Sequence, residues 1–243
     1  MRYLIKLSYD GSRYHGYQRQ PGFNTIQEQL EKALTKINNG NQTFFHSSGR
    51  TDRGVHAHTQ FGHADMNINI NEYKLKRAMN SNLPKDIHII ETKKVEDNFH
   101  ARYNVKSKTY QYLINIGEYN PIQKDYVFQY NHKLNIRNMQ KAIKYLKGTH
   151  DYRYFVTENK DKENCIRTIF FAKIELKNDI IKITFKGTGF LRYQVRNMVG
   201  TLIQVGENKI SPKAVEKMLE SKDRSVGGKT APSQGLYLVD VIY

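Results

Sequence analysis

The sequence predicts a mixed α/β (α+β) fold built from two ferredoxin-like halves, and three observations support this. Apolar patterns follow the order strand-helix-strand-strand-helix-strand over residues 2–95, and the same order returns over residues 108–243 with one added helix. A chain of 243 residues is long enough for each half to bury a core. The segment 96–107 carries neither pattern and would connect them. We therefore expect halves at 1–104 and 105–243, with their sheets joined into one extended mixed sheet, helices on one face and a groove between the halves.

Strand alternation and helix capping define the first half. Every second residue of Arg2–Tyr9 is apolar or aromatic, as in a strand with one buried face. Thr25 and Glu28 form a capping box at the start of a helix that Gly40 ends. The remaining elements expected here are strands at 43–46 and 59–66, a helix after Asn71, and a strand at 87–95.

The second half repeats the order with its own turn and cap signals. The polar residues 177–179 separate two strand patterns and predict a hairpin. Ser211 and Pro212 predict a helix, as its cap and its first-turn proline. The other elements expected are a strand at 108–116, a helix at 135–147 followed by Gly148, hairpin strands at 167–176 and 180–186, an apolar helix at 190–205 and a closing strand at 236–243.

The charge balance restricts the partners. The chain holds 39 Lys and Arg against 23 Asp and Glu, a formal net charge of +16. Such an excess favours polyanions, nucleic acid first and an acidic membrane surface second. Cys165 is the only cysteine, so an intramolecular disulfide is excluded and a reducing cytoplasm fits. A membrane span needs about 18 consecutive apolar residues, and the sequence has no such run. We expect a soluble, cytoplasmic protein.

The most polar stretch, Ser47–Gln60, carries the strongest chemical signal. Its one acid, Asp52, lies between Arg50 and Arg53 in what reads as a loop. Neighbouring guanidinium groups would lower the pKa of the Asp52 carboxyl and keep it ionised, as a nucleophile or an electrostatic catalyst requires. An aspartate that caps a turn beside two solvated arginines would give the same pattern, so this alternative stays open.

Three further polar stretches could face the groove. Tyr110 and Tyr112 lie on one face of a predicted strand that follows Lys106. Arg192 and Arg196 share a face of the apolar helix, where a guanidinium group has to reach a partner or solvent. Asp52 is a possible partner for Arg196. The third stretch is the turn at 230–238.

Metal and nucleotide cofactors are not expected. His46, His56, His58 and His63 come without cysteines and without a His-Glu-x-x-His pattern, which argues against zinc. The chain has no Walker loop and no dinucleotide fingerprint after its first strand.

Eight motifs, in order along nearly the whole chain, resemble the tRNA pseudouridine synthase A family. They are YDGSRYHGYQRQ, TIQEQLEKAL, SSGRTDRGVHA, FHAR, KTYQYLI, GTHDYRYF, GTGFLRYQVRNMVGTLIQVG and APSQGLYL. The resemblance implies an isomerase that converts uridine to pseudouridine in the anticodon stem-loop of tRNA, at positions 38, 39 and 40. It also implies a homodimer, no cofactor and no metal, and the duplicated architecture described above, whose groove would hold the RNA.

The resemblance assigns roles to five residues. Asp52 matches the essential aspartate, and Arg50 matches the arginine that helps to expel the target base. Tyr110 matches the tyrosine that packs on the base, and Arg196 matches the arginine paired with the aspartate. Leu236 matches an apolar residue that lines the uracil pocket.

The sequence departs from the family pattern at two positions. Arg53 stands where alanine is usual, and Gly200 stands where many members have a basic residue. Which uridines are modified is therefore left open. Further contacts to RNA are expected from the polar stretches, mainly through phosphates, by Arg13, Arg19, Arg53, His58, Lys106, Lys108 and Arg192.

Two other classes of function remain as alternatives. Charge alone would suit a non-catalytic RNA-binding module, although such a surface gains nothing from a central carboxylate. A nucleotidase with glycosidase-type chemistry usually needs two carboxylates, and the polar stretches supply one. Product analysis separates the three: isomerised uridine, free uracil or unchanged RNA.

Overall fold

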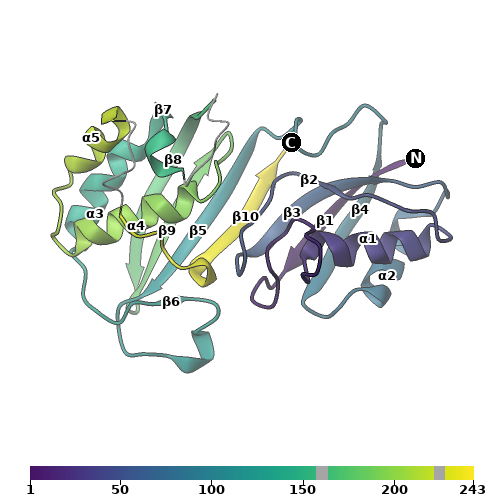
Figure 1. Ribbon diagram of the computed structural model, residues 1–243, viewed down its shortest axis with the longest axis horizontal. Coiled ribbons are helices and arrows are strands. Elements are labelled where there is room, and N and C mark those ends of the chain that lie inside the picture. Colours follow the sequence, from purple (N-terminus) through teal and green to yellow (C-terminus); the bar gives the residue numbers. More distant parts are fainter. Residues whose placement is uncertain (157–163, 222–227) are drawn as a thin grey trace. The chain divides into compact units, whose positions relative to one another are not determined.

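The fold is mixed α/β, as predicted. The structure, a computed structural model, contains five α-helices and ten strands within the part of the chain that it describes (Figure 1). The described residues are 1–156, 164–221 and 228–243.

Backbone contacts divide the chain into two compact units. The first holds Met1–Lys106 together with Tyr237–Tyr243, and the second holds Ser107–Leu236. The division falls two residues after the expected boundary, but the closing strand belongs mainly to the first unit and not, as we expected, to the second. This strand runs parallel to a strand of the first unit, and a pairing between segments so distant in sequence leaves no local pattern. The expected extended sheet that joins the two halves, and the groove between them, stay predictions. The assignment of functional roles to each half also stays a prediction.

The first unit follows the predicted order strand-helix-strand-strand-helix-strand. Its strands are arranged β4-β1-β3-β10, and the short β2 pairs with β3. All pairs are antiparallel except β3 with β10. The elements are β1 (Arg2–Tyr9), α1 (Ile26–Ile37), β2 (His46–Ser47), β3 (His56–Asp65), α2 (Glu72–Asn82), β4 (Ile87–Val95) and the closing β10 (Leu236–Ile242).

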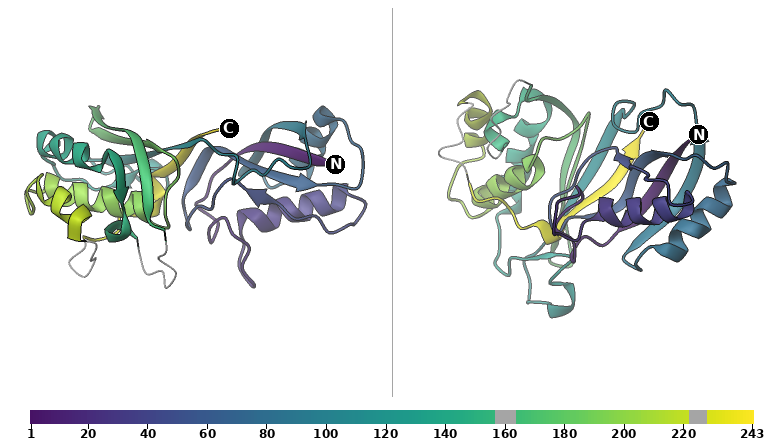
Figure 2. Two further views of the ribbon diagram at one scale, coloured as in Figure 1. Left: turned by 90° about the horizontal axis from the view of Figure 1, so that it is seen from above. Right: turned by 45° about the vertical axis from the view of Figure 1, so that its right-hand side comes forward.

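The core of this unit lies between the sheet and its two helices. Every second residue of β1 is buried, and α1 buries its apolar stripe, which confirms both patterns. The Thr25 hydroxyl accepts from the Glu28 amide (3.4 Å), so the predicted cap is also confirmed. The two helices contact each other, and Figure 2 (left) shows α1 on one side of the strands of its unit.

The second unit has the strand order β5-β9-β8-β7, with the short β6 beside β5. The β8–β9 hairpin turns at Asn178 and Asp179, which both have positive φ (49° and 60°), as a tight two-residue hairpin requires. The elements are β5 (Ser107–Asn115), β6 (Phe128–Gln129), α3 (Ile136–Ala142), β7 (Gly148–Asp151), β8 (Ile166–Lys177), β9 (Ile180–Gly187), α4 (Gln194–Gly206) and α5 (Ala214–Ser221), with short 3₁₀ turns at Pro121–Gln123, Ile143–Leu146, Arg153–Phe155 and Ser233–Gly235.

Three predicted boundaries in the second unit were wrong by a few residues. The apolar helix begins at Gln194 and not at Phe190, because Tyr193 is left-handed (φ 59°) and interrupts the helical backbone. The helix predicted at 135–147 continues after Ala142 only as a 3₁₀ turn. The helix expected from Ser211 is α5, which begins three residues later. Apolar periodicity does not distinguish a helix from the turns that flank it.

Candidate active site

The loop between β2 and β3, residues 48–55, is held at its N-terminal side by a buried glutamine. The side-chain amide of Gln60 on β3 donates to the Gly49 carbonyl (2.8 Å). The Gln60 oxygen accepts from the Ser48 hydroxyl and from the Phe61 amide. Ser48 and Gln60 are both fully buried, so these bonds are shielded from water.

The middle of the loop is tied to β1 and to the segment after it. The Thr51 hydroxyl lies 2.8 Å from the Tyr9 hydroxyl, and both groups are buried. The Thr51 carbonyl accepts from the Tyr17 amide (3.0 Å). Thr51 is thus fixed through its side chain and its backbone, directly before Asp52.

The C-terminal side of the loop packs against Gly11. A Cβ at Gly11 would clash with the Val55 carbonyl, so only glycine permits this approach. The Gly11 amide donates to Nδ1 of the buried His56 (3.1 Å), and an Asp10 carboxylate oxygen lies 3.1 Å from the same nitrogen. The loop is therefore anchored at both ends and in its middle.

Asp52 lies within this rigid frame, and its own side chain is half-buried. Its carbonyl accepts from the Val55 amide (3.2 Å), which closes a turn around Arg53 and Gly54. Arg50 and Arg53 are exposed on either side. A carboxylate on a fixed backbone between two exposed cations can be held ready for an incoming nucleotide.

A stack of three rings follows the loop. The Tyr237 ring of β10 lies between His56 and His58 of β3. Its centroid is 4.8 Å from that of His56 and 5.1 Å from that of His58. His58, one of the predicted RNA contacts, is exposed at the end of the stack. This exposed ring is a surface on which a base could stack.

In the second unit, Tyr110 lies on β5 with most of its surface covered. Its ring meets that of Phe190 edge to face, with centroids 5.2 Å apart. On the same face of β5, the Tyr112 hydroxyl donates to the Pro232 carbonyl (2.6 Å). This confirms the prediction that Tyr110 and Tyr112 lie on the same face of one strand.

The first turn of α4 is fastened to the segment before β10. The Arg196 Nε donates to the Ala231 carbonyl (2.7 Å), and the Ala231 amide donates to the Arg196 carbonyl (3.1 Å). At the next residue, the Asn197 amide group donates to the Phe155 carbonyl (2.6 Å), and its oxygen accepts from the Thr230 hydroxyl (2.7 Å). These contacts hold the start of α4 and the Arg196 Nε against the segment before β10.

The other predicted site residues occupy different parts of the two units. Leu236 is buried at the start of β10. Lys106 is exposed at the end of the first unit, and its amide donates to the Ile242 carbonyl (2.8 Å). Lys108 lies on β5, and Arg13 is exposed in the loop after β1.

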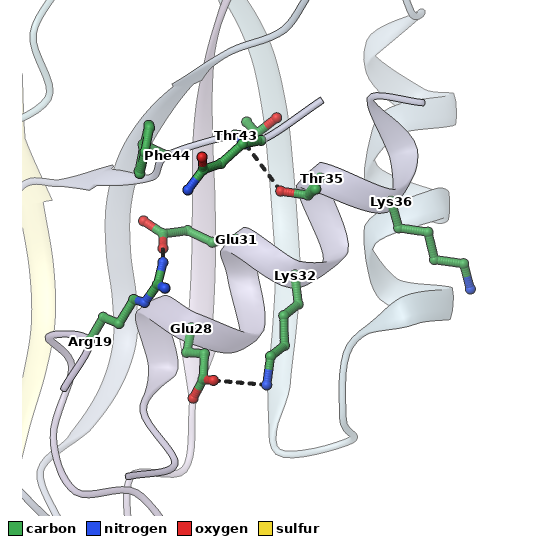
Figure 3. A pocket seen from close by; sticks show the side chains of 9 residues that line it. Arg19, Glu28, Glu31, Lys32, Thr35, Lys36, Thr43 and Phe44 are labelled. Atoms are coloured by element: carbon green, nitrogen blue, oxygen red, sulfur yellow. Dashed lines mark hydrogen bonds and ion pairs between the residues drawn. The ribbon is translucent and has the colours of Figure 1, made fainter. Parts of the chain in front are cut away.

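Arg19, one of the predicted RNA contacts, lies at a hollow beside α1 and makes its ion pair there. Its guanidinium group pairs with Glu31 of α1 (3.4 Å), at a hollow of about 410 Å³ (Figure 3). The Glu31 carboxylate also accepts from the Phe45 amide (3.1 Å) and from Gln27 (2.9 Å), which holds the segment before β2 on the helix. The hollow is lined by Arg19, Glu28, Glu31, Lys32, Thr35, Lys36, Gln42, Thr43 and Phe44.

The histidines considered as metal ligands fall into two groups. His46 and His63 stack with centroids 5.0 Å apart, whereas His56 and His58 flank Tyr237. Among the described residues, no cluster of three or more His, Cys, Asp or Glu side chains could hold a metal ion. Nor does any helix in that part of the chain have the length and apolar character to cross a membrane.

Comparison with known proteins identifies the family. Residues 6–104 and 142–243 match the sequence profile of tRNA pseudouridine synthases. The chain belongs to this family. The tRNA pseudouridine synthases A of Streptococcus agalactiae and Streptococcus mutans are each 42% identical to it, over 100% of this chain and 95% and 99% of theirs. That of Streptococcus sanguinis is 41% identical, over 100% of this chain and 98% of its own.

A match to a solved structure is more distant. The Cbf5-Nop10-Gar1 complex shares 9% identity at a TM-score of 0.33, over 82% of this chain and 54% of that one, which is too remote for any inference.

Membership of this family confirms the prediction that the protein is an isomerase. The structure also explains one of the two positions at which the sequence departs from the family pattern. A Cβ at Gly200 of α4 would clash with the Lys229 carbonyl, so a basic side chain has no room there. The other departure, Arg53, is exposed on the loop, where a long polar side chain can reach solvent.

The sequence did not reveal which residues of this pseudouridine synthase hold the Asp52 loop in place. Tyr9 fits an ordinary strand alternation, and Gln60 is one polar residue in a strand. The available signal was that a buried phenol or amide needs a hydrogen-bond partner. Tyr193 was also missed, and no local pattern marks it.

Proposed function

We propose that the chain converts uridine to pseudouridine in the anticodon stem-loop of tRNA, at positions 38 to 40, with Asp52 as the essential carboxylate. The family membership supports the reaction and the tRNA substrate. The observation that carries the role of Asp52 is its place on a backbone anchored by Tyr9, Gln60 and Gly11. The net charge of +16 favours a polyanionic substrate.

The reaction moves one glycosidic bond within the nucleotide. The bond between N1 and C1′ breaks, the uracil rotates, and C5 bonds to C1′ while the C5 proton is lost and N1 gains a proton. Asp52 assists as a carboxylate, either by attack on the sugar carbon or by removal of a sugar proton. Arg196 is proposed to keep it ionised and oriented through a charge-assisted hydrogen bond.

Other residues hold the nucleotide outside its stack. The target has to leave the helix, and Arg50 would fill the space it leaves. Tyr110 would stack on the detached base so that it rotates without escaping, and Leu236 would line its pocket. His58, Arg53 and the other residues predicted to contact RNA would bind phosphates or neighbouring bases. Because the product is an isomer of the substrate, the reaction needs neither a redox carrier nor an energy source.

We further propose that the protein acts as a cytoplasmic homodimer without cofactor. The excess of positive charge and the single buried cysteine Cys165 support a cytoplasmic RNA-binding protein.

The test uses a tRNA transcript with uridines at positions 38 to 40 and a matched transcript with cytidines there. After incubation, nucleosides are separated and counted, and free uracil is measured. We expect pseudouridine from the first transcript only and no free uracil. Release of uracil would favour a nucleotidase, unchanged RNA would favour a binding module, and pseudouridine elsewhere in both transcripts would contradict the assigned positions.

A further inference from the structure

Tyr193, the residue before α4, has a backbone conformation that does not suit its side chain. Its φ and ψ are 59° and 0°, in the left-handed region. Six described residues other than glycine have positive φ, and the remaining five are asparagine or aspartate: Asn39, Asn131, Asn178, Asp179 and Asn208. Bulky side chains disfavour this region, whereas Asn and Asp tolerate it.

Helix capping does not explain the tyrosine either. Tyr193 occupies the N-cap of α4, where Asn, Asp and Ser are favoured because their side chains accept from the first amides. The Tyr193 side chain makes no capping hydrogen bond. Both the backbone and the cap would therefore favour asparagine, and the ring has to serve another purpose.

The ring contacts two arginines. The guanidinium carbons of Arg192 and Arg196 each lie 5.1 Å from the centroid of the Tyr193 ring. Two cations beside one ring repel each other, and the electron-rich ring face offsets this repulsion. The left-handed backbone at Tyr193 brings the ring to the position where both side chains meet it.

The two arginines differ in their surroundings. Arg192 is exposed, as a contact to RNA phosphate requires. Arg196 is half-buried and fastened to Ala231 through its Nε. One ring thus lies beside an exposed guanidinium and an anchored one.

We propose that Tyr193 is a positioning residue, whose ring orients Arg196 toward the reacting nucleotide and Arg192 toward a phosphate of the tRNA. This inference rests on the proposed function, in which Arg196 holds the Asp52 carboxylate ionised and oriented beside the reacting uridine. Strained backbone conformations persist where the surrounding structure needs them, and the need here is the placement of two charges.

The experiment compares two substitutions at this position. Tyr193→Asn removes the ring and suits the left-handed backbone, and Tyr193→Phe keeps the ring and removes the hydroxyl. Asn178→Gly, at another left-handed residue in the β8–β9 turn, is the matched control for backbone effects. Each protein is measured for its melting temperature, its Kd for tRNA and its single-turnover rate with saturating enzyme.

We expect Tyr193→Asn to melt at the parent temperature or above while its single-turnover rate falls roughly 10-fold to 100-fold, because a displaced catalytic contact is costly. Its Kd should rise about two- to fivefold through the weakened hold on Arg192. Tyr193→Phe and Asn178→Gly should keep the parent rate and Kd.

Two results would overturn the inference. One is a Tyr193→Asn protein with the parent rate and Kd. The other is a rate loss that accompanies a lower melting temperature in both Tyr193 variants, which indicates a structural role. If the parent makes no pseudouridine, the proposed function fails, and the ring is then tested by binding: Arg192→Gln should weaken binding in the parent but not in Tyr193→Asn.

Discussion

The hydroxyl of Tyr9 on β1 lies 2.8 Å from the hydroxyl of Thr51, and both are buried. Burial raises the pKa of the Tyr9 phenol to about 12, so it stays protonated and able to hydrogen-bond at any physiological pH. This one bond connects the central strand of the first unit to the residue before Asp52. The position of the proposed carboxylate thus depends on a side chain in the sheet core.

Tyr9→Phe should therefore lower both stability and turnover. Loss of the buried bond should lower the free energy of unfolding by about 1–2 kcal/mol, measured by urea denaturation. The single-turnover rate should fall as well, because the loop loses a constraint beside Asp52. Tyr3→Phe is the matched control, since the Tyr3 hydroxyl donates to the Ile70 carbonyl (2.8 Å) away from this loop. Equal effects of both substitutions on the rate would contradict the role of Tyr9.

Tyr110 should act through its ring in binding the base. Tyr110→Phe should bind tRNA like the parent, whereas Tyr110→Ala should lose about 1–3 kcal/mol of binding free energy, the usual value of a stacked base. The measurement is the Kd for a tRNA transcript. Equal Kd values for the Phe and Ala variants would contradict stacking. The rate of Tyr110→Phe reports separately on the hydroxyl, since an accumulating RNA adduct would assign it to proton transfer at C5.

Stability should decrease on acidification because of His63. Burial, with a contribution from Arg2, lowers the pKa of His63 to about 4, and its Nδ1 accepts from the Ala101 amide (3.2 Å). A histidine in the unfolded chain titrates near a pKa of about 6.5. Between these two pKa values the unfolded chain binds a proton that the folded chain does not, so the free energy of unfolding falls as the pH is lowered through this window.

The measurement is urea denaturation between pH 7.5 and pH 4.5 of the parent and of His63→Asn. The asparagine oxygen can accept from the Ala101 amide but does not titrate. His63→Asn should show a shallower decline, and some decline should remain because burial also lowers the pKa of His100. Parallel curves for the two proteins would refute the assignment.

Arg53 should contribute to binding through phosphate and not to the chemistry. If tRNA affinity depends on phosphate contacts, it falls steeply with salt, and Arg53→Ala should reduce the slope of log K against log salt by about 1. The single-turnover rate at saturation should not change. Arg77→Ala, at an exposed arginine stacked on Tyr73 of α2, is the control and should leave the slope unchanged. The same slope for parent and Arg53→Ala would exclude a phosphate contact.

The order of helices and strands could be predicted because its signals are local. Alternation along β1, the Thr25 cap and the Asn178-Asp179 turn each depend on a few neighbouring residues. The pairing of β10 with β3 could not be predicted, since it joins two segments about 180 residues apart in the sequence. The start of α4 was misplaced because the apolar run extends past the left-handed Tyr193.

The Asp52 loop could be predicted from its composition, but its supports could not. Arg50, Asp52 and Arg53 are adjacent in sequence, so their proximity needs no fold. Tyr9 and Gln60 act on the loop only after the sheet has formed, and in sequence each is an ordinary strand residue. A sequence can thus reveal the chemical group of a site while its rigidity depends on the tertiary structure.

The central claim is that the Asp52 carboxylate is essential for isomerisation. The most direct measurement is the release of tritium from tRNA labelled at uracil C5, because the C5 hydrogen is lost to water when C5 bonds to the sugar. Asp52→Asn keeps the size of the side chain and a hydrogen-bonding oxygen but removes its charge and most of its nucleophilicity. We predict that the parent releases tritium without added cofactor, and that Asp52→Asn binds tRNA as tightly as the parent yet releases none. Release of tritium at the parent rate by a folded Asp52→Asn protein would contradict the account.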